Sequence, residues 1–168
     1  SAHGPREPPG LEGLLAAELD RCRRYRRAMP AAVLVDCDDF KAINSEHGHS
    51  GGDAALVALA EVMVETVRAS DTVARVGGDE FVILLPETEV SAALLLADRV
   101  RAAVDTVRVE HAGKRFGLTV SLGVSRVTED CQSASELLEV TQLGLARSKA
   151  KGKNQVRMSG SFGIAARH

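Results

Sequence analysis

Apolar residues recur every three to four positions in four segments of the chain. This spacing is typical of helices that bury one face, and it predicts helices over about 11–28 and 53–69. Two more segments begin with residues that favour a helix N-terminus. Thr88 is the expected N-cap of a helix to about Val104, and Ser133 with Glu136 forms a capping-box pattern ahead of a helix to about Ala150.

Short apolar runs between these segments predict strands. They lie at 31–35, 71–76, 80–85, 107–111, 116–127 and 155–158. Gly77 and Gly78 separate two of them and indicate a tight hairpin turn, because glycine supplies the positive φ that such turns require. The polar stretch from Asp38 to Gly52 is interpreted as a loop.

The order of these elements defines a fold class. A strand–helix–strand–strand–helix–strand kernel is the split βαβ, ferredoxin-like pattern, so we predict an α+β fold with a central, mainly antiparallel sheet flanked by helices. We expect one domain over 11–158. Residues 1–10 are interpreted as a disordered lead-in or an expression remnant, and residues 159–168 as a flexible tail.

Composition narrows the possible functions. The 168 residues carry 21 basic and 23 acidic side chains, which argues against a basic nucleic-acid binder, and 3% aromatics argue against a base-stacking platform. No apolar run approaches the roughly 20 residues that span a bilayer. Three cysteines without a Cys-x-x-Cys motif indicate neither a disulfide framework nor a zinc site, so we predict a cytoplasmic location, either free or as the cytoplasmic part of a membrane-attached protein.

Three carboxylates are candidates for a metal site. Asp36 follows a buried strand, and Asp79 and Glu80 follow the Gly77-Gly78 turn, so a central hairpin would bring all three together. An oxygen-rich site of this kind suits Mg²⁺ or Mn²⁺ and, with it, a phosphate substrate. The alternative is that the three are ordinary polar residues of a turn and two strand ends.

Other polar residues have two interpretations each. The loop after Asp38 could form an anion-binding nest, and Asn44 could bind a base edge or make an Asx-turn. Asp53 could bind a ligand or simply complement the start of a helix. Lys149 and Lys153 could reach phosphates or complement a helix C-terminus.

Five motifs, in order, resemble those of the GGDEF family of diguanylate cyclases. They are VDCDDFKAIN at 35–44, GHSGGD at 48–53, RVGGDEF at 75–81, FGLTVSLGV at 116–124 and KAKGKN at 149–154. The resemblance covers about residues 11–158 and implies a nucleotidyl-cyclase-like version of the predicted fold. It also implies condensation of two GTP into cyclic di-GMP with release of pyrophosphate, by a homodimer in which each chain holds one GTP.

The same resemblance implies roles for single residues. Mg²⁺ or Mn²⁺ would bind Asp36, Asp79, Glu80 and the backbone carbonyl of Cys37, and Asp79 or Glu80 would assist deprotonation of the attacking hydroxyl. Asn44 and Asp53 match positions that recognise guanine. The triphosphate would be held by the following residues: Asp39, Phe40, Lys41, Lys149 and Lys153.

A further motif resembles the family's inhibitory site for the product. Arg68-Ala-Ser-Asp71 matches its Arg-x-x-Asp pattern, and Arg99 matches a supporting arginine. The resemblance therefore implies feedback inhibition by cyclic di-GMP. The alternative is a simple ion pair at a helix end, worth a few tenths of a kcal/mol.

The sequence also departs from the family pattern. The family's opening Asp-x-Leu-Thr motif is missing from residues 4–11, Gln142 replaces an Asp, Ala146 a Tyr, and Lys153 an Arg. An alternative function is therefore a degenerate module that binds cyclic di-GMP or GTP without turnover, and another is a scaffold that binds no nucleotide. The arginines between 21 and 27 are interpreted as a helix end near an upstream sensory or regulatory domain, or alternatively as a phosphate-binding cluster.

Overall fold

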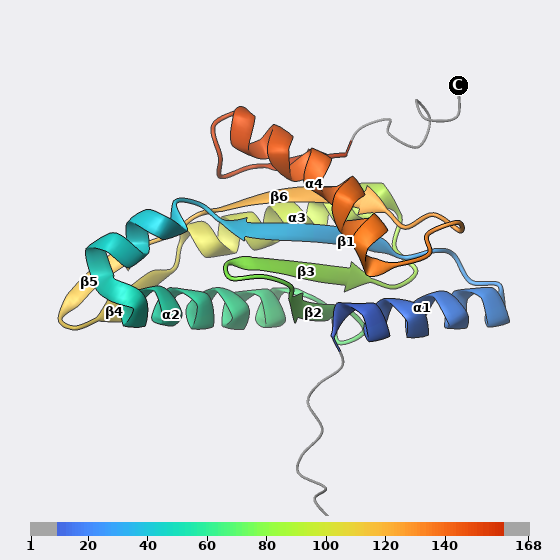
Figure 1. Ribbon diagram of the computed structural model, residues 1–168, viewed down its shortest axis with the longest axis horizontal. Coiled ribbons are helices and arrows are strands. Elements are labelled where there is room, and N and C mark those ends of the chain that lie inside the picture. Colours follow the sequence, from blue (N-terminus) through green and yellow to red (C-terminus); the bar gives the residue numbers. More distant parts are fainter. Residues whose placement is uncertain (1–9, 160–168) are drawn as a thin grey trace, which may run out of the picture.

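A computed structural model describes residues 10–159 of the chain. Figure 1 shows helices packed around a central sheet. The helices are α1 (Leu11–Tyr25), α2 (Phe40–Thr66), α3 (Val90–Asp105) and α4 (Ala134–Ala150). The strands are β1 (Ala31–Cys37), β2 (Thr72–Arg75), β3 (Glu80–Leu85), β4 (Arg108–His111), β5 (Lys114–Gly117), β6 (Val120–Arg126) and β7 (Val156–Met158).

The main sheet has the strand order β2-β3-β1-β6-β7. Only the β6–β7 pair is parallel, so the predicted α+β fold with a mainly antiparallel sheet is confirmed. Strand β1 lies at the centre and every one of its residues is buried, which places its C-terminal end, Asp36 and Cys37, inside the molecule. Strands β4 and β5 form a separate hairpin.

The sheet buries both of its faces. Alternate residues of a strand point to opposite sides, so Val33 and Val35 pack with α2 and α3, whereas Ala32 and Leu34 pack with α1 and α4. Helix α4 thereby lies against β6, β7 and β1, the strand that holds Asp36 (Figure 1). No helix within residues 10–159 combines the length and apolar character needed to cross a membrane.

Several predicted boundaries were wrong. The expected loop from Asp38 to Gly52 is the first part of α2, which begins at Phe40 and bends at Gly48 (φ 74°). Helix α1 ends at Tyr25, because Arg26 takes a left-handed conformation. Glu89, and not Thr88, occupies the N-cap of α3.

Two other boundary predictions can be compared with the structure. The expected strand over 116–127 is divided between β5 and β6. The Ser133 N-cap is confirmed, because its side chain accepts from the backbone N–H of Glu136. The reciprocal bond of a capping box is displaced by one residue: the Glu136 carboxylate accepts from the backbone N–H of Gln132 and not from that of Ser133. The lead-in before residue 10 and the tail beyond residue 159 lie outside the described residues.

Candidate functional site

The end of β1 and the Gly77-Gly78 turn lie next to each other. Asp36 stands directly opposite Glu80 in the antiparallel β1–β3 pair. Beyond that pair the Cys37 amide donates to the Asp79 carbonyl at 3.2 Å, so the turn is tied to the end of β1. The pairing of β1 with β3 therefore brings Asp36, Asp79 and Glu80 to one edge of the sheet.

Asp36 is a buried carboxylate with one satisfied oxygen. Its Oδ2 accepts from the Lys149 ammonium of α4, whereas its Oδ1 is buried and has no hydrogen-bond partner among the described residues. Burial raises the pKa of Asp36 to about 6; the Lys149 ammonium counteracts this and the neighbouring Asp79 carboxyl adds to it. An unpartnered buried carboxylate oxygen is costly, and a cation would stabilise it.

The surroundings of Asp36 fit a divalent cation in part. Burial and the nearby carboxylates raise the pKa of the Cys37 thiol to about 12, so the thiol stays protonated and only its backbone carbonyl is suited to Mg²⁺. Glu80 accepts from the Gln142 amide at 3.3 Å. Across residues 10–159, no three His, Cys, Asp or Glu side chains stand close enough together to enclose a metal ion, so the site presents an open edge with Asp36 as its innermost oxygen.

Asp38 is a site residue for which the sequence analysis assigned no role. Its buried carboxylate accepts from Thr119 Oγ1 at 2.7 Å, from Ser121 Oγ at 2.6 Å and from the backbone N–H of Asn154 at 3.0 Å. These bonds join β1, β6 and the segment after α4. The alternation of Thr119 and Ser121 along one strand was the only signal for them in the sequence.

The segment after α4 lies against the start of α2. Lys153 and Asn154 both have left-handed backbone conformations, with φ of 66° and 46°. Lys153 Nζ contacts Asp39 Oδ1 at 2.6 Å, and both side chains are largely exposed. The two lysines predicted to bind phosphates thus both lie near the end of β1, each paired with a carboxylate.

The start of α2 offers backbone donors to an anion. Asp39 has φ 54° and occupies the N-cap position, so the free amides of the first turn point out of the helix at its positive end. Lys41 is exposed on this turn, whereas Phe40 packs against the core. The structure therefore brings Lys153 into contact with Asp39, three residues after Asp36, and leaves Lys41 exposed on the same turn of α2.

Asn44 lies against Gly52, the residue before Asp53, across the bend in α2. The Asn44 side chain lies so close to Gly52 that a Cβ on that glycine would overlap its amide oxygen and approach the Phe40 ring. Asp53 follows directly and is exposed. Gly52 is thus required by a close side-chain approach, and the bend places Asn44 one residue away from Asp53, the other predicted guanine-binding residue.

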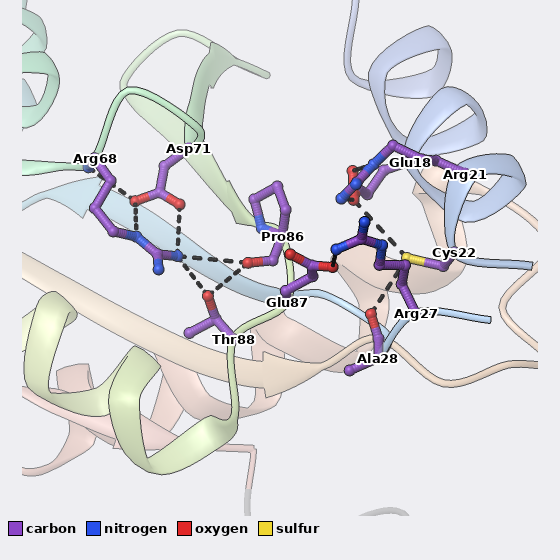
Figure 2. Close-up of polar contacts among 10 residues, drawn as sticks. All are labelled: Glu18, Arg21, Cys22, Arg27, Ala28, Arg68, Asp71, Pro86, Glu87 and Thr88. Atoms are coloured by element: carbon purple, nitrogen blue, oxygen red, sulfur yellow. Dashed lines mark hydrogen bonds and ion pairs between the residues drawn. The ribbon is translucent and has the colours of Figure 1, made fainter. Parts of the chain in front are cut away.

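Arg68 and Asp71 form a tightly bonded pair (Figure 2). The guanidinium donates to both carboxylate oxygens of Asp71, at 3.2 and 2.9 Å, and also to Thr88 Oγ1 at 2.5 Å. The Asp71 side chain is fully buried, whereas the Arg68 side chain is 53% exposed. Arg99 lies exposed on α3 and, among the described residues, forms no hydrogen bond or ion pair with Arg68 or Asp71, so its supporting role stays a prediction.

A groove of about 320 Å³ separates Arg68 from α1. Figure 2 shows two further ion pairs on its far side, Arg21 with Glu18 and Arg27 with Glu87, each at 2.6 Å. Arg23 donates to the Glu129 carbonyl. These contacts within the chain favour the interpretation of the arginine cluster as a helix end over the phosphate-binding alternative.

The chain matches the family described as diguanylate cyclase, GGDEF domain, over residues 10–155. It is 38% identical over 127 residues to diguanylate cyclase A of Treponema denticola, covering 76% of this chain and 34% of that protein. The chain thus spans about a third of the length of this relative.

Two solved structures have the same fold. The diguanylate cyclase SiaD of Pseudomonas aeruginosa, crystallised with its activator SiaC, superposes with a TM-score of 0.82 at 30% identity, covering 88% of this chain and 56% of that one. The active GGEEF domain of a diguanylate cyclase from Vibrio cholerae superposes with a TM-score of 0.76 at 27% identity, covering 88% and 94%. This chain belongs to the GGDEF domain family of diguanylate cyclases.

Proposed function

We propose that this domain condenses two GTP into cyclic di-GMP and releases pyrophosphate. The observation that carries the proposal is the buried, unpartnered Oδ1 of Asp36 at the edge that also holds Asp79 and Glu80. In a member of this family, such an oxygen is suited to a metal that binds a nucleotide triphosphate.

Each chain would bind one GTP. The Asp53 carboxylate accepts hydrogen bonds from the guanine N1–H and N2–H₂ groups, and the Asn44 amide both donates and accepts at the base edge. The triphosphate lies over the start of α2, where the Asp39–Lys41 amides donate to it. Lys149 and Lys153 are partly exposed, so each can turn from its carboxylate partner toward a phosphate.

The metal would be held by Asp36, Asp79, Glu80 and the Cys37 carbonyl. When bound, Mg²⁺ or Mn²⁺ neutralises phosphate charge and lowers the pKa of a hydroxyl group that it contacts. Asp79 or Glu80 accepts the proton from the ribose hydroxyl. The residues at the end of β1 thereby combine binding and proton transfer at one place.

Catalysis would require two chains. The 3′-hydroxyl of one GTP attacks the α-phosphorus of the other, an O–P bond forms, and the bond to pyrophosphate breaks. Two such transfers close the cyclic product, so two domains must face each other with their reactants in line. A homodimer of half-sites follows from this chemistry.

An assay over a range of protein concentrations tests the proposal. The protein is incubated with GTP and Mg²⁺, and the products are separated by chromatography. We expect cyclic di-GMP, at a rate per chain that rises with concentration. If covalently linked dimers bind GTP but form no product, the proposed synthesis is wrong and the domain is a nucleotide receptor. If they do not bind GTP, the domain is a scaffold that binds no nucleotide.

Feedback inhibition would operate through Arg68. Replacing Arg68 with Ala removes the guanidinium that can pair with a phosphate and stack on a purine. We expect the variant to continue synthesis at product concentrations that stop the wild type, with an inhibition constant raised about tenfold or more. Titration of initial rates with added cyclic di-GMP measures it.

Arg24→Ala is the control, because it likewise removes an arginine that is paired with a nearby Asp, here Asp20 of α1. It should leave product inhibition unchanged. Equal inhibition constants in wild type and Arg68→Ala would show that the Arg68–Asp71 pair serves only the end of the helix.

A regulatory partner would act from outside residues 11–158, the single domain that we propose. SiaD binds a separate activator protein. In this chain, α1 is joined to the β3–α3 loop by Arg27 and Glu87, close to Thr88 and Arg68. We propose a cytoplasmic domain in which an upstream sensory or regulatory domain acts through α1.

A further inference from the structure

We propose that the β4–β5 hairpin sets the geometry of guanine recognition, with His111 and Phe116 as its positioning residues. The inference rests on the proposed function, since it concerns Asn44 and Asp53. Neither His111 nor Phe116 would touch the nucleotide. Both act through the bend in α2, beside which the hairpin lies (Figure 1).

The bend is the joint between the two guanine-binding residues. Asn44 lies before Gly48 and Asp53 after it, so the backbone at Gly48 decides how far apart their side chains stand. Gly48 has φ 74° and ψ 171°, outside the helical region. Because Gly48 departs from helical geometry, the two parts of α2 do not form one regular helix, and contacts from other elements help to fix the angle between them.

The hairpin holds the bend on both sides of Gly48. Before it, the His47 ring stacks on Phe116 of β5, with centroids 3.9 Å apart and planes 14° apart. After it, Ser50 Oγ hydrogen-bonds to His111 Nε2 of β4 at 3.0 Å. The His47 side chain is only 7% exposed, so the stacked contact is shielded from water.

Gly51 completes the contact surface. It is buried, and a Cβ at this position would lie 2.5 Å from His47 Cβ and 3.5 Å from His111 Cδ2. The segment after the bend therefore fits closely between a residue of α2 and a residue of the hairpin. This fit leaves little room for the segment to shift, and Asn44 and Asp53 are held in one relative position.

The hairpin is itself anchored to the rest of the domain. Val109 is buried in the core shared with α2 and α3, and it pairs with Phe116 across the two strands. His111 stands at the end of β4 next to the Ala112-Gly113 turn. The β4–β5 hairpin, which carries His111 and Phe116, is thus anchored in the core although it lies outside the main sheet.

Loss of the His111 and Phe116 contacts should weaken recognition of guanine and leave the rate of the chemical step unchanged. In the double variant with His111→Ala and Phe116→Ala, the bend can relax while Asp36 and Glu80 stay in place. We expect the KM for GTP to rise about tenfold, with kcat within about twofold of wild type. The preference for GTP over inosine triphosphate, which lacks the 2-amino group, should fall as well.

Two variants separate positioning from folding. Arg115→Ala lies on the same hairpin, but its side chain is exposed and its position, paired with Glu110, faces away from the bend. It should change neither KM nor base preference. His111→Gln retains a group that can bond Ser50 and should restore most of the wild-type KM compared with His111→Ala.

The outcomes distinguish this inference from the proposed function. Wild-type protein without GTP turnover would contradict the proposed function, and with it the inference. Wild-type turnover with an unchanged KM and base preference in the double variant would overturn the inference alone. An equal loss in the double variant and in Arg115→Ala would also overturn it, because the effect would then be one of hairpin stability.

Discussion

Replacing Asp36 with Asn should lower the turnover of GTP by about a thousandfold or more and, above pH 7, raise the thermal stability of the domain. The loss of turnover follows from removing the buried carboxylate of the proposed metal site. The gain in stability follows from burial, which raises the pKa of Asp36 to about 6 in the folded chain, above the ordinary value of about 3.9. Initial rates and thermal unfolding of both proteins measure the two effects.

The stability effect should depend on pH in a defined direction. The folded state binds the Asp36 proton more tightly than the unfolded state does. The contribution of Asp36 to the free energy of unfolding therefore falls as pH rises from about 4 to about 6 and stays low above that range. The Asp36→Asn variant lacks this part of the slope, so the two proteins should differ more at pH 8 than at pH 4. Wild-type affinity for Mg²⁺ should increase over the same range, since a cation binds the ionised carboxylate.

Asp20→Asn is the matched control, since Asp20 is an exposed carboxylate that pairs with an Arg of its own helix. It should leave turnover unchanged. The assignment of Asp36 to the metal site would be wrong if its Asn variant kept turnover within about tenfold of wild type. A lower stability of that variant at pH 8 would contradict the effect of burial.

The sheet was predictable because its signals are local. The short apolar runs became β1, β2 and β3, and the Gly77-Gly78 turn joins β2 to β3 as a hairpin. The pairing of β1 with β3, which places Asp36 opposite Glu80, is a long-range contact that the turn does not set. The start of α2 was not predictable in this way. Polar residues and three glycines between 38 and 52 favoured a loop, but Phe40 and Ile43 pack against the core and hold the segment helical. Tertiary packing overrode local preference there.

The carboxylates of the site could be named from the sequence, but most of their partners could not. Lys149 lies 113 residues from Asp36, and no local pattern joins the two. The three donors to Asp38 come from two other segments and meet only in the folded sheet. The resemblance to the family located the residues, and the structure adds which charges neutralise one another.

The close approach of α4 to β6 gives the second large effect, on stability. Gly123 has no Cβ, and a methyl group there would lie 2.5 Å from the Thr141 carbonyl oxygen and 2.9 Å from the Gly144 carbonyl carbon of α4. These atoms are helix backbone, so an alanine at this position could fit only if α4 lifted from the sheet. Overpacking of this kind lowers the free energy of unfolding by about 3 kcal/mol, which corresponds to a fall of about 10 °C in Tm.

The displacement of α4 should also reach the site. Ser148 Oγ donates to the Leu122 carbonyl, and Lys149 contacts Asp36 one residue further on. We therefore expect Gly123→Ala to lower Tm and to increase amide exchange in α4 more than in α2. Exchange measured by mass spectrometry on the folded variant, below its Tm, tests this second part separately from stability.

Ser125→Ala is the matched control for Gly123→Ala, because Ser125 lies two residues further along β6 and on the same face of the sheet. Its Oγ is buried and has no hydrogen-bond partner among the described residues, so its removal should leave Tm unchanged or slightly higher. A Tm of Gly123→Ala within about 1 °C of the Ser125→Ala value would show that α4 tolerates the methyl group. In that case, the close packing of α4 on Gly123 does not determine the position of Lys149 beside Asp36.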